Sequence, residues 1–293
     1  MKKTNRTRDF VEVVMNGIFF TAGMAAILFT ALITVYLFIS GLPAIGEIGI
    51  LEFLFGTRWA STADEPSYGI LPFILSSFYG TAGAVLIGVP VGLLTSVYLS
   101  KVAGPRTARV VGSAVELLAG IPSVIYGLIG MIVLVPAVAE LFDLASGATL
   151  LAAILVLSVM ILPSIVSASV TALNAVPPEY EQASLALGAT QMETYFKVSA
   201  PAAGSGIAAG IVLGVGRAIG EAMAVMMVAG NVANMPGLFR SVRFLTTAIA
   251  SEMGYSSGLQ RQALFSIALV LFLFIMALNG FLNRVLKGGR HHD

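Results

Sequence analysis

Six long apolar segments constrain this chain more than any other feature of its sequence. A helix needs roughly 20 apolar residues to cross a hydrocarbon core about 30 Å thick. The segments cover, to within a few residues, positions 17–39, 70–99, 110–138, 150–176, 206–229 and 263–282. The composition agrees, because 57% of the residues are hydrophobic and only 11% are charged. We therefore predict an all-α integral membrane protein with six transmembrane helices.

Basic residues near the segment ends predict the orientation of the chain. They are Lys2, Lys3, Arg6, Arg8, Lys101, Arg106, Arg109, Arg284, Lys287 and Arg290. Cytoplasmic connections are enriched in lysine and arginine, so both termini and the connection after the second segment are expected to be cytoplasmic. Six crossings also place both termini on one side.

One connection disagrees with this charge pattern. Residues 231–262 fall outside the cell by helix parity, yet they include Arg240, Arg243 and Arg261. The charge rule is weaker for a connection of this length, so we follow parity. We expect a re-entrant or surface helix near residues 244–253.

The domain organisation follows from the segments. We predict a cytoplasmic N-terminal tail at 1–16, one transmembrane domain at 17–284 and a cytoplasmic C-terminal tail at 285–293. The first apolar run is too long for the apolar region of a secretory signal and shows no clear small-residue cleavage site. It is interpreted as a retained transmembrane helix.

Several kinds of chemistry are not expected in this chain. It has no cysteine, which excludes thiolate catalysis and cysteine-based metal sites, and it has no GxxxxGK[ST] phosphate loop. His291 and His292 stand together in the C-terminal tail without metal-site partners nearby. With 16 basic and 15 acidic residues, the chain also lacks the basic surface of a nucleic-acid-binding protein. We predict a non-catalytic membrane subunit without a metal site.

The longest cytoplasmic connection, residues 177–205, has the pattern of two short helices. Pro178 suits the first turn of a helix, Gly188 suits its end, and Thr190 with Glu193 has the spacing of a capping box. Two interpretations are open for this segment. It is an amphipathic connection that packs on its own helices, or it is a docking element for a soluble partner.

The fifth segment contains two charges, in the stretch "GVGRAIGEAMAV". A charge at the centre of a membrane costs roughly 2.5–3.5 kcal/mol, so Arg217 and Glu221 are expected to face protein or a water-filled path. Their four-residue spacing predicts neighbouring positions on one helix face, where they can pair. The pair serves either packing or a transport path, and we favour the path.

Small residues support close packing of this segment against another helix. They recur at every fourth position, at Gly206, Gly210, Gly214, Ala218 and Ala222. Such a stripe lets helix backbones approach closely. Arg217 and Glu221 lie at its edge, so both side chains are expected to point toward a neighbouring helix or subunit.

An arginine in such a path suits a tetrahedral oxyanion, because its planar fork donates two parallel hydrogen bonds and stays charged in a dry site. We expect Arg217 to bind the anion during its passage. We expect Glu221 to position Arg217 and to weaken its attraction for the anion. Glu116 and Ser123 in the third segment are further candidates for the path. A break of the helix at Gly120, Pro122 and Ser123 would line the path. Alternatively, Glu116 reaches Arg109 or water at the membrane interface, and the segment is only kinked for packing.

The stretch "EQASLALGATQMETYFKVSAP" resembles the EAA loop of ABC importer permeases, whose pattern is Glu-Ala-Ala, three residues, Gly, nine residues, Ile, one residue, Leu-Pro. Gly188 and Pro201 keep this spacing, while other pattern positions differ. The differing positions are Gln182, Ser184, Val198 and Ala200. The resemblance implies that the loop docks on an ATPase subunit. The docking residues that it implies are Glu181, Gln182, Ala183, Leu185, Gly188 and Ala189.

Four further stretches are similar to the phosphate-specific ABC importer permeases, and in particular to their PstC-type subunit. They are "YGILPFI", "ELLAGIPSVIYGLIGM", "GVGRAIGEAMAVMMVAGN" and "EMGYSSGLQRQALF". The resemblance implies a phosphate-importing permease in a prokaryotic cell membrane, working by alternating access. The implied partners are a PstA-type permease, two copies of a PstB-type ATPase that bind ATP and magnesium, and a PstS-type phosphate-binding protein.

Two other functions stay open at this point. An ABC permease for another oxyanion, such as sulfate or molybdate, would differ in its competition by those anions. An ATP-independent anion carrier or channel would transport without other subunits, and the docking loop argues against it. Internal inverted repeats, which are frequent in secondary carriers, are not evident in the sequence.

Overall fold

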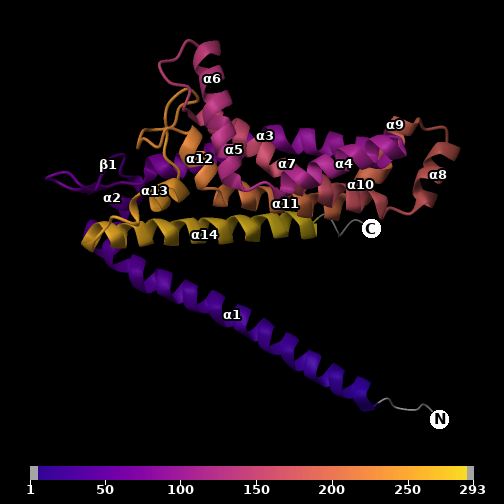
Figure 1. The fold of residues 1–293 in the computed structure, drawn as a ribbon, viewed down its shortest axis with the longest axis horizontal. Helices are drawn as coiled ribbons and strands as arrows, with labels where there is room; N and C mark the ends of the chain where they lie inside the picture. Colours follow the sequence, from indigo (N-terminus) through magenta and orange to yellow (C-terminus); the bar gives the residue numbers. More distant parts are fainter. Residues whose placement is uncertain (1–5, 289–293) are drawn as a thin grey trace.

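The computed structural model describes residues 6–288, and in this range the chain is almost entirely helical (Figure 1). The helices are α1 (Arg6–Ile48), α2 (Ile50–Phe55), α3 (Leu71–Val97), α4 (Pro105–Gly120), α5 (Ser123–Ile129), α6 (Val135–Leu141), α7 (Leu150–Asn174), α8 (Pro178–Ala186), α9 (Gln191–Thr194), α10 (Ala200–Ala202), α11 (Gly204–Gly220), α12 (Met223–Val228), α13 (Leu245–Glu252) and α14 (Gly258–Gly288). Three π-helical turns, η1 (Tyr98–Val102), η2 (Gly130–Leu134) and η3 (Tyr195–Ser199), interrupt or extend them. The predicted all-α membrane protein is confirmed.

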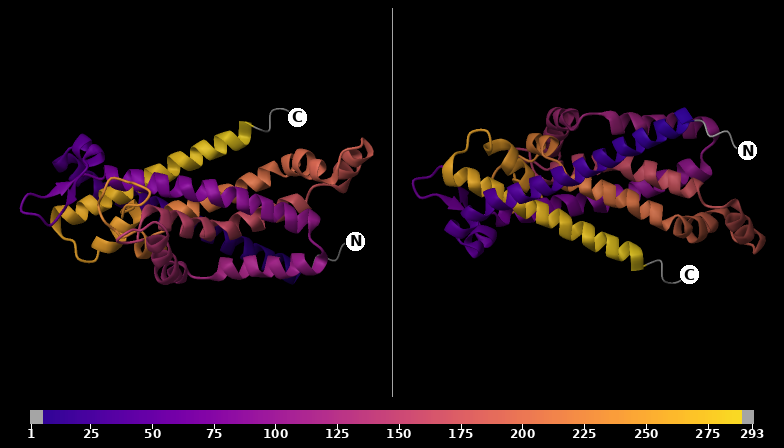
Figure 2. Two further views of the ribbon diagram at one scale, coloured as in Figure 1. Left: turned by 90° about the horizontal axis from the view of Figure 1, so that it is seen from above. Right: turned by 90° about the horizontal axis from the view of Figure 1, so that it is seen from below.

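The long helices form a bundle around α7. Helices α3 and α11 pack on α7 along its length, and α4 and α12 also contact it. In Figure 2 these helices run along one direction, with a small hairpin at one end of the bundle and α8 at the other. The hairpin pairs β1 (Trp59–Ala60) with β2 (Ser67–Tyr68) in antiparallel fashion. We name the two ends of the bundle the hairpin end and the loop end.

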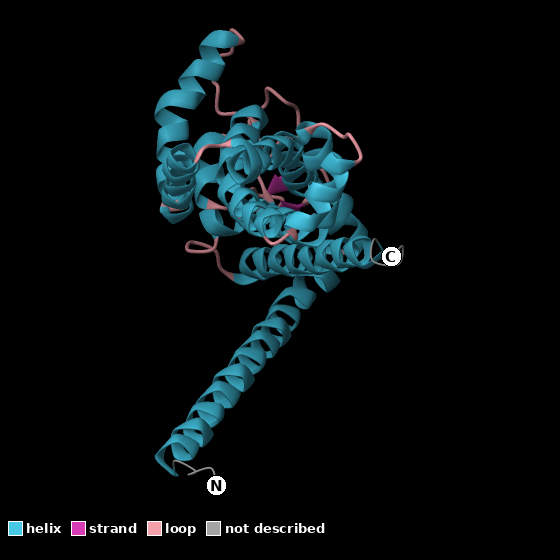
Figure 3. Cartoon of the chain, turned by 90° about the vertical axis from the view of Figure 1, so that its right-hand side faces the viewer, coloured by secondary structure: helices cyan, strands magenta, loops and turns pink. Residues whose placement is uncertain are grey.

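Helix α1 leaves the bundle and contacts mainly α14 (Figure 3). At the crossing, a Cβ on Gly41 would lie 3.0 Å from the backbone oxygen of Phe265, so a larger residue would push the two helices slightly apart. The Ser266 hydroxyl donates to the Gly41 carbonyl, and Tyr36 packs edge-on against Phe265. The start of α1 and the end of α14 both lie toward the loop end (Figure 1). Of the predicted tails, residues 1–5 and 289–293 lie outside the described residues, and the remainder is helical.

Five helices in the described part of the chain have the length and composition of membrane spans. They are Val11–Ile48, Leu71–Val102, Ser123–Leu141, Leu150–Asn174 and Gly258–Gly280. A sixth results when Gln191–Ala202 and Gly204–Gly220, which meet at a bend of 73°, are counted together. The first, second, fourth and sixth predicted segments are therefore confirmed, whereas the third and fifth need correction.

The third predicted segment is not one helix. Helix α4 ends at Gly120, Ile121 is extended (φ −71°, ψ 127°), and α5 begins after Pro122. Proline removes a backbone donor and disfavours helix in the residue before it, which explains the break. Figure 1 shows α6 pointing across the bundle, whereas α4 runs along it beside α7. By length and composition, Ser123–Leu141 qualifies as a membrane span. Because α4 runs along the bundle and α6 points across it, we assign this crossing to α4 instead.

The fifth predicted segment is also interrupted. Helix α11 ends at Gly220, Glu221 is extended (φ −74°, ψ 127°), and α12 begins at Met223. The course of the chain through α3, α4 and α5 thus recurs in α7, α11 and α12. In each half a long helix is followed by a returning helix, a short extended break and a short helix. The two short helices pack together, and a Cβ on Gly127 of α5 would lie only 2.7 Å from the Cα of Ala224 in α12.

The predicted small-residue stripe on α11 is confirmed as a packing surface. A Cβ on Gly206 would lie 2.4 Å from the Cβ of Ala172, and one on Gly210 would lie 2.8 Å from the Cβ of Ala168. Both partners belong to α7. Glycine at these two positions therefore allows the backbones of α11 and α7 to approach closely.

The helix expected near residues 244–253 is α13, but it is not a surface helix. Leu245, Thr246, Thr247 and Ala248 are buried. Helix α13 packs between α3, α12 and α14 at the hairpin end of the bundle. The part of the connection 231–262 that forms the start of α13 thus belongs to the core, whereas residues such as Arg240 and Tyr255 are exposed.

Candidate functional site

The interruption between α11 and α12 contains the two charged residues expected in the path. Arg217 lies in the last turn of α11 and is half-buried, while Glu221 follows the helix end and is 9% exposed. The predicted pairing of these residues on one helix face is wrong. The helix ends between them, and within residues 6–288 they form no ion pair with each other.

Glu221 instead holds the two sides of the interruption in place. Its Oε1 atom accepts a hydrogen bond of 3.0 Å from the Ala224 amide in the first turn of α12. Its backbone carbonyl accepts a hydrogen bond of 2.7 Å from the Thr246 hydroxyl of α13. A carboxylate at the start of a helix satisfies a free amide and interacts favourably with the helix dipole. Glu221 therefore caps α12. No contact supports the expectation that Glu221 weakens the attraction of Arg217 for an anion.

Arg217 lies close to the end of α4. Tyr126 of α5 donates a hydrogen bond of 2.7 Å to the carbonyl of Leu118, one of the last carbonyls of α4. Ala218, which follows Arg217 in α11, belongs to the same buried cluster as Tyr126, and Leu118 packs against that cluster. The two interrupted helices thus converge beside Tyr126, with Arg217 as the charge at that point. This proximity could not be derived from the sequence, because Tyr126 and Arg217 belong to different halves of the chain.

The other two path candidates lie on and just after α4. Glu116 is exposed on this helix and makes no ion pair with Arg109 in the described part of the chain, so that expected contact is absent. Ser123 is half-buried at the start of α5. Arg106, Arg109, Ser113 and Glu116 recur every three or four residues and are all exposed, so they form one polar stripe along α4. A polar stripe at membrane depth requires water or another protein beside it.

An apolar cavity of about 540 Å³ is lined in part by Tyr126. It is lined by residues of α3, α4, α5 and α7, including Val91, Leu118, Ile129 and Leu162. Apart from the hydroxyls of Tyr126 and Ser158, the side chains that line the cavity offer no hydrogen-bond donors to a desolvated anion. This cavity is therefore not part of an anion site, and the polar stripe and Arg217 are the better candidates.

The loop 177–205 has the predicted architecture of two short helices. Gly188 separates α8 from α9 with φ +91°, a conformation that favours glycine. The Thr190 hydroxyl accepts from the Glu193 amide, and the Glu193 carboxylate accepts from the Thr190 amide, which completes the capping box. Among the expected docking residues, Gln182, Ala183, Leu185 and Gly188 are exposed, and Ala189 is half-buried. The most exposed apolar side chain of the loop is Leu187, at 91%.

Glu181 does not face outward with the other expected docking residues. Its carboxylate lies 2.6 Å from the Lys101 ammonium at the end of the α3–η1 helix and accepts a hydrogen bond of 2.8 Å from the Ser199 hydroxyl. Burial opposes the charged form, but the hydrogen bonds from Lys101 and Ser199 and the charge of Lys101 outweigh it. The pKa of Glu181 is therefore below its ordinary value. Glu181 anchors the loop to the bundle.

We expect this anchor to weaken in acid and on replacement of Lys101. A carboxylate with a lowered pKa stabilises the folded state above its ordinary pKa of about 4.3, and that contribution is lost as the pH falls through the lower folded value. Lys101→Met should remove about 2–3 kcal/mol of local stability at neutral pH, because it leaves Glu181 without its cation. Hydrogen exchange of residues 178–200 measures both effects. Lys197→Met is the matched control, because its ion pair with Glu193 is exposed to solvent and should contribute little to stability. Equal exchange in both variants would contradict the anchoring role.

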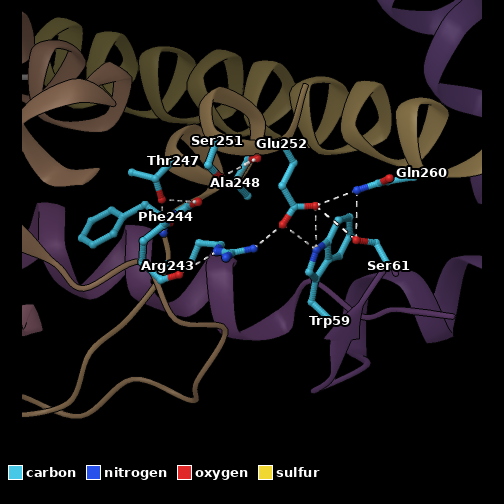
Figure 4. Close-up of polar contacts among 10 residues, drawn as sticks. Trp59, Ser61, Arg243, Phe244, Thr247, Ala248, Ser251, Glu252 and Gln260 are labelled. Atoms are coloured by element: carbon cyan, nitrogen blue, oxygen red, sulfur yellow. Dashed lines mark hydrogen bonds and ion pairs between the residues drawn. The ribbon is translucent and has the colours of Figure 1, made fainter. Parts of the chain in front are cut away.

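A second polar cluster lies at the hairpin end and was not predicted. Glu252 of α13 forms an ion pair with Arg243 and accepts hydrogen bonds from Trp59 Nε1, the Ser61 hydroxyl and the Gln260 amide (Figure 4). Each residue looks unremarkable in the sequence, and Trp59 and Glu252 lie 193 positions apart. The pairing also explains one arginine of the connection 231–262, because Arg243 is neutralised within the fold.

Comparisons with known proteins identify relatives of this chain. Residues 84–288 match the model of the family described as "Binding-protein-dependent transport system inner membrane component". The chain is 38% identical over 282 residues to a probable ABC transporter permease protein, YqgH, of Bacillus subtilis, covering 93% of this chain and 91% of that protein. It is 35% identical to the phosphate transport system permease protein PstC of Pasteurella multocida, covering 76% and 75%. In fold, it resembles a chain of a bacterial alginate ABC transporter, with a TM-score of 0.62, 14% identity and 96% coverage of both chains.

Proposed function

Because this chain belongs to the family of binding-protein-dependent transport system inner membrane components, we propose that it is the transmembrane permease subunit of an ATP-driven importer of inorganic phosphate. The observation that carries this proposal is the half-buried Arg217 at the interruption of a bundle helix. In the described part of the chain, its guanidinium has no carboxylate partner. It is therefore available to an anionic cargo, to which it can donate two parallel hydrogen bonds.

The choice of phosphate among oxyanions rests on the relatives. Several proteins similar to this chain are phosphate transport system permease proteins of the PstC type. Sulfate and molybdate are the competing cargos, because an arginine recognises any tetrahedral oxyanion by the same geometry. Anion competition in an uptake assay separates these possibilities.

The polar stripe on α4 supports a shared path rather than a path within one chain. Arg106 and Arg109 lie in the first turns of α4, Glu116 lies nearer the end of this helix, and Arg217 lies in the last turn of α11. An exposed polar face of this kind is covered when a second permease of similar structure packs against it. We propose a PstA-type permease as this second subunit and alternating access between the two as the mechanism.

The remaining partners follow from the two ends of the bundle. The exposed residues of α8 and the adjacent Leu187 and Gly188 form the proposed contact with a PstB-type ATPase dimer, which binds ATP and magnesium. This assigns the loop end and both termini to the cytoplasm of a prokaryotic cell. The hairpin end then faces a PstS-type phosphate-binding protein. In this arrangement the present chain needs no cofactor of its own.

The function is tested by labelled phosphate uptake in cells that lack a high-affinity phosphate importer. The chain is supplied together with its second permease, ATPase and binding protein. Uptake that depends on an intact ATPase and is not reduced by excess sulfate or molybdate supports the proposal. Uptake that those anions abolish changes the cargo, and transport by this chain alone indicates a carrier or channel.

Leu187 is expected to be the main apolar contact with the ATPase. Its side chain is 91% exposed at the tip of the loop, and burial of a leucine contributes about 1.5–3 kcal/mol. Leu187→Ser should therefore reduce co-purification of the ATPase by about tenfold or more. Tyr255→Ser is the control, because Tyr255 is 95% exposed at the opposite end of the bundle. An unchanged yield of ATPase with Leu187→Ser would place the contact elsewhere.

A further inference from the structure

Helix α13 joins the hairpin end of the molecule to the interruption beside Arg217. Its first turn contacts the interruption, and its last residue belongs to the polar cluster of the hairpin. The residue of interest at the inner end is Thr246.

The Thr246 side chain is 8% exposed, and its hydroxyl donates to the Glu221 carbonyl at 2.7 Å. This carbonyl follows the last turn of α11, where backbone acceptors no longer have partners in their own helix. The Glu221 carboxylate at the same time receives the Ala224 amide of α12. One residue, Glu221, thus joins α12 through its side chain and α13 through its backbone.

Two contacts keep the start of α13 in a fixed position. The Leu245 amide donates to the Ser77 hydroxyl of α3 at 2.9 Å. The Phe244 amide donates to the Thr247 hydroxyl, which caps the helix locally. The Thr246 hydroxyl is therefore oriented by a helix that is itself attached to α3.

At the other end of α13, Glu252 is held by four side chains from three segments. Arg243 precedes the helix, Gln260 begins α14, and Trp59 and Ser61 belong to the hairpin (Figure 4). The Glu252 side chain is 19% exposed, so these contacts are partly shielded from water. Through these contacts, a displacement of the hairpin would be transmitted directly to α13.

We propose that Thr246 is a positioning residue for transport. It holds the interruption between α11 and α12 in the geometry that presents Arg217, and α13 with its Glu252 cluster links this geometry to the hairpin. The proposal rests on the proposed function, because the hairpin is the surface that would meet the binding protein. A shift of the hairpin on docking would then reach Glu221 through one short, rigid helix.

The test measures hydrogen exchange of residues 221–229 in the complete complex, in lipid nanodiscs. Thr246→Val keeps the shape of the side chain and removes the donor, so the exchange of this segment should rise about tenfold. Thr246→Ser restores the donor and should return exchange to within about twofold of the wild-type rate. Thr171→Val is the matched control, since the Thr171 hydroxyl bonds only to the Ser167 carbonyl of its own helix. Exchange of residues 150–174 reports any general loss of stability.

A second arm tests the link to the hairpin. Glu252→Gln should also raise exchange at 221–229, and the combination with Thr246→Val should exchange no faster than Thr246→Val alone, because both changes act on one connection. Phosphate uptake should fall with Thr246→Val and recover with Thr246→Ser.

Two results would overturn the proposal. One is exchange at 221–229 that does not respond to Thr246→Val, and the other is an effect of Glu252→Gln that persists undiminished in the double variant. The exchange measurement does not depend on the cargo. Failure of phosphate uptake in the wild type would therefore reject the proposed function and leave the role of Thr246 to be decided by exchange.

Discussion

Replacing Arg217 with glutamine is expected to reduce phosphate uptake by at least about 100-fold in the assembled transporter. A hydrogen bond to a charged group contributes about 1.5–3 kcal/mol, and the guanidinium can donate two to one anion. The loss of both therefore corresponds to a factor of about 100 or more. Arg217→Lys keeps the charge but not the planar fork, so its uptake should lie between those of the wild type and Arg217→Gln.

The measurement is the initial rate of labelled uptake at saturating binding protein, normalised to the amount of assembled complex. Arg240→Gln is the matched control, because it removes the same charge from an exposed position in the connection 231–262. Its uptake should stay within about twofold of the wild type, as expected for a surface substitution. Equal uptake by the two glutamine variants would show that Arg217 serves packing alone.

Gly127→Ala is expected to destabilise the packing of α5 on α12. The added methyl group would lie 2.7 Å from the Cα of Ala224 and 2.8 Å from the Met227 sulfur. A backbone atom cannot move aside without shifting α12, and overpacking of this kind costs about 1–3 kcal/mol. Because α12 carries the cap made by Glu221, the displacement also reaches the interruption beside Arg217.

Gly216→Ala provides the comparison for this substitution. Gly216 also lies within a helix, but a Cβ at this position meets no atom within 4 Å. The same change should therefore be neutral or stabilise α11 by up to about 1 kcal/mol, because alanine favours helix over glycine. Both variants are measured by thermal unfolding of the detergent-purified complex, with the fraction of the second permease that stays bound as the signal. Similar melting temperatures for the two would contradict the close packing of α5 on α12.

Much of the fold could be predicted from the sequence, because hydrophobic length and local capping are local properties. Four of the six segments and the helix pair around Gly188 are where the pattern indicates. The interruptions were harder to predict. At Pro122 the break was foreseen as one of two interpretations, but at Glu221 nothing in the periodicity distinguishes a continuous amphipathic helix from two short ones.

The candidate site was predicted in its residue types but not in its contacts. Four-residue spacing predicts an ion pair between Arg217 and Glu221 only when the helix continues between them. The actual partners of Glu221 are Ala224 and Thr246, and the latter lies 25 positions away. Likewise, the pattern match placed Glu181 among the docking residues, whereas its side chain is occupied by Lys101. Such long-range contacts depend on how the elements pack, which no local pattern records.

The polar stripe of α4 also bears on the biogenesis of the transporter. A copy of this chain inserted without its second subunit would hold Glu116 against lipid, at a cost of about 3 kcal/mol. A factor of about 150 in the equilibrium between inserted and displaced helix corresponds to that energy. Orphan copies would therefore sample states in which α4 leaves the bilayer more often than assembled copies do. The exposed acidic residue of α4 thus links the stability of the inserted chain to its assembly with another protein.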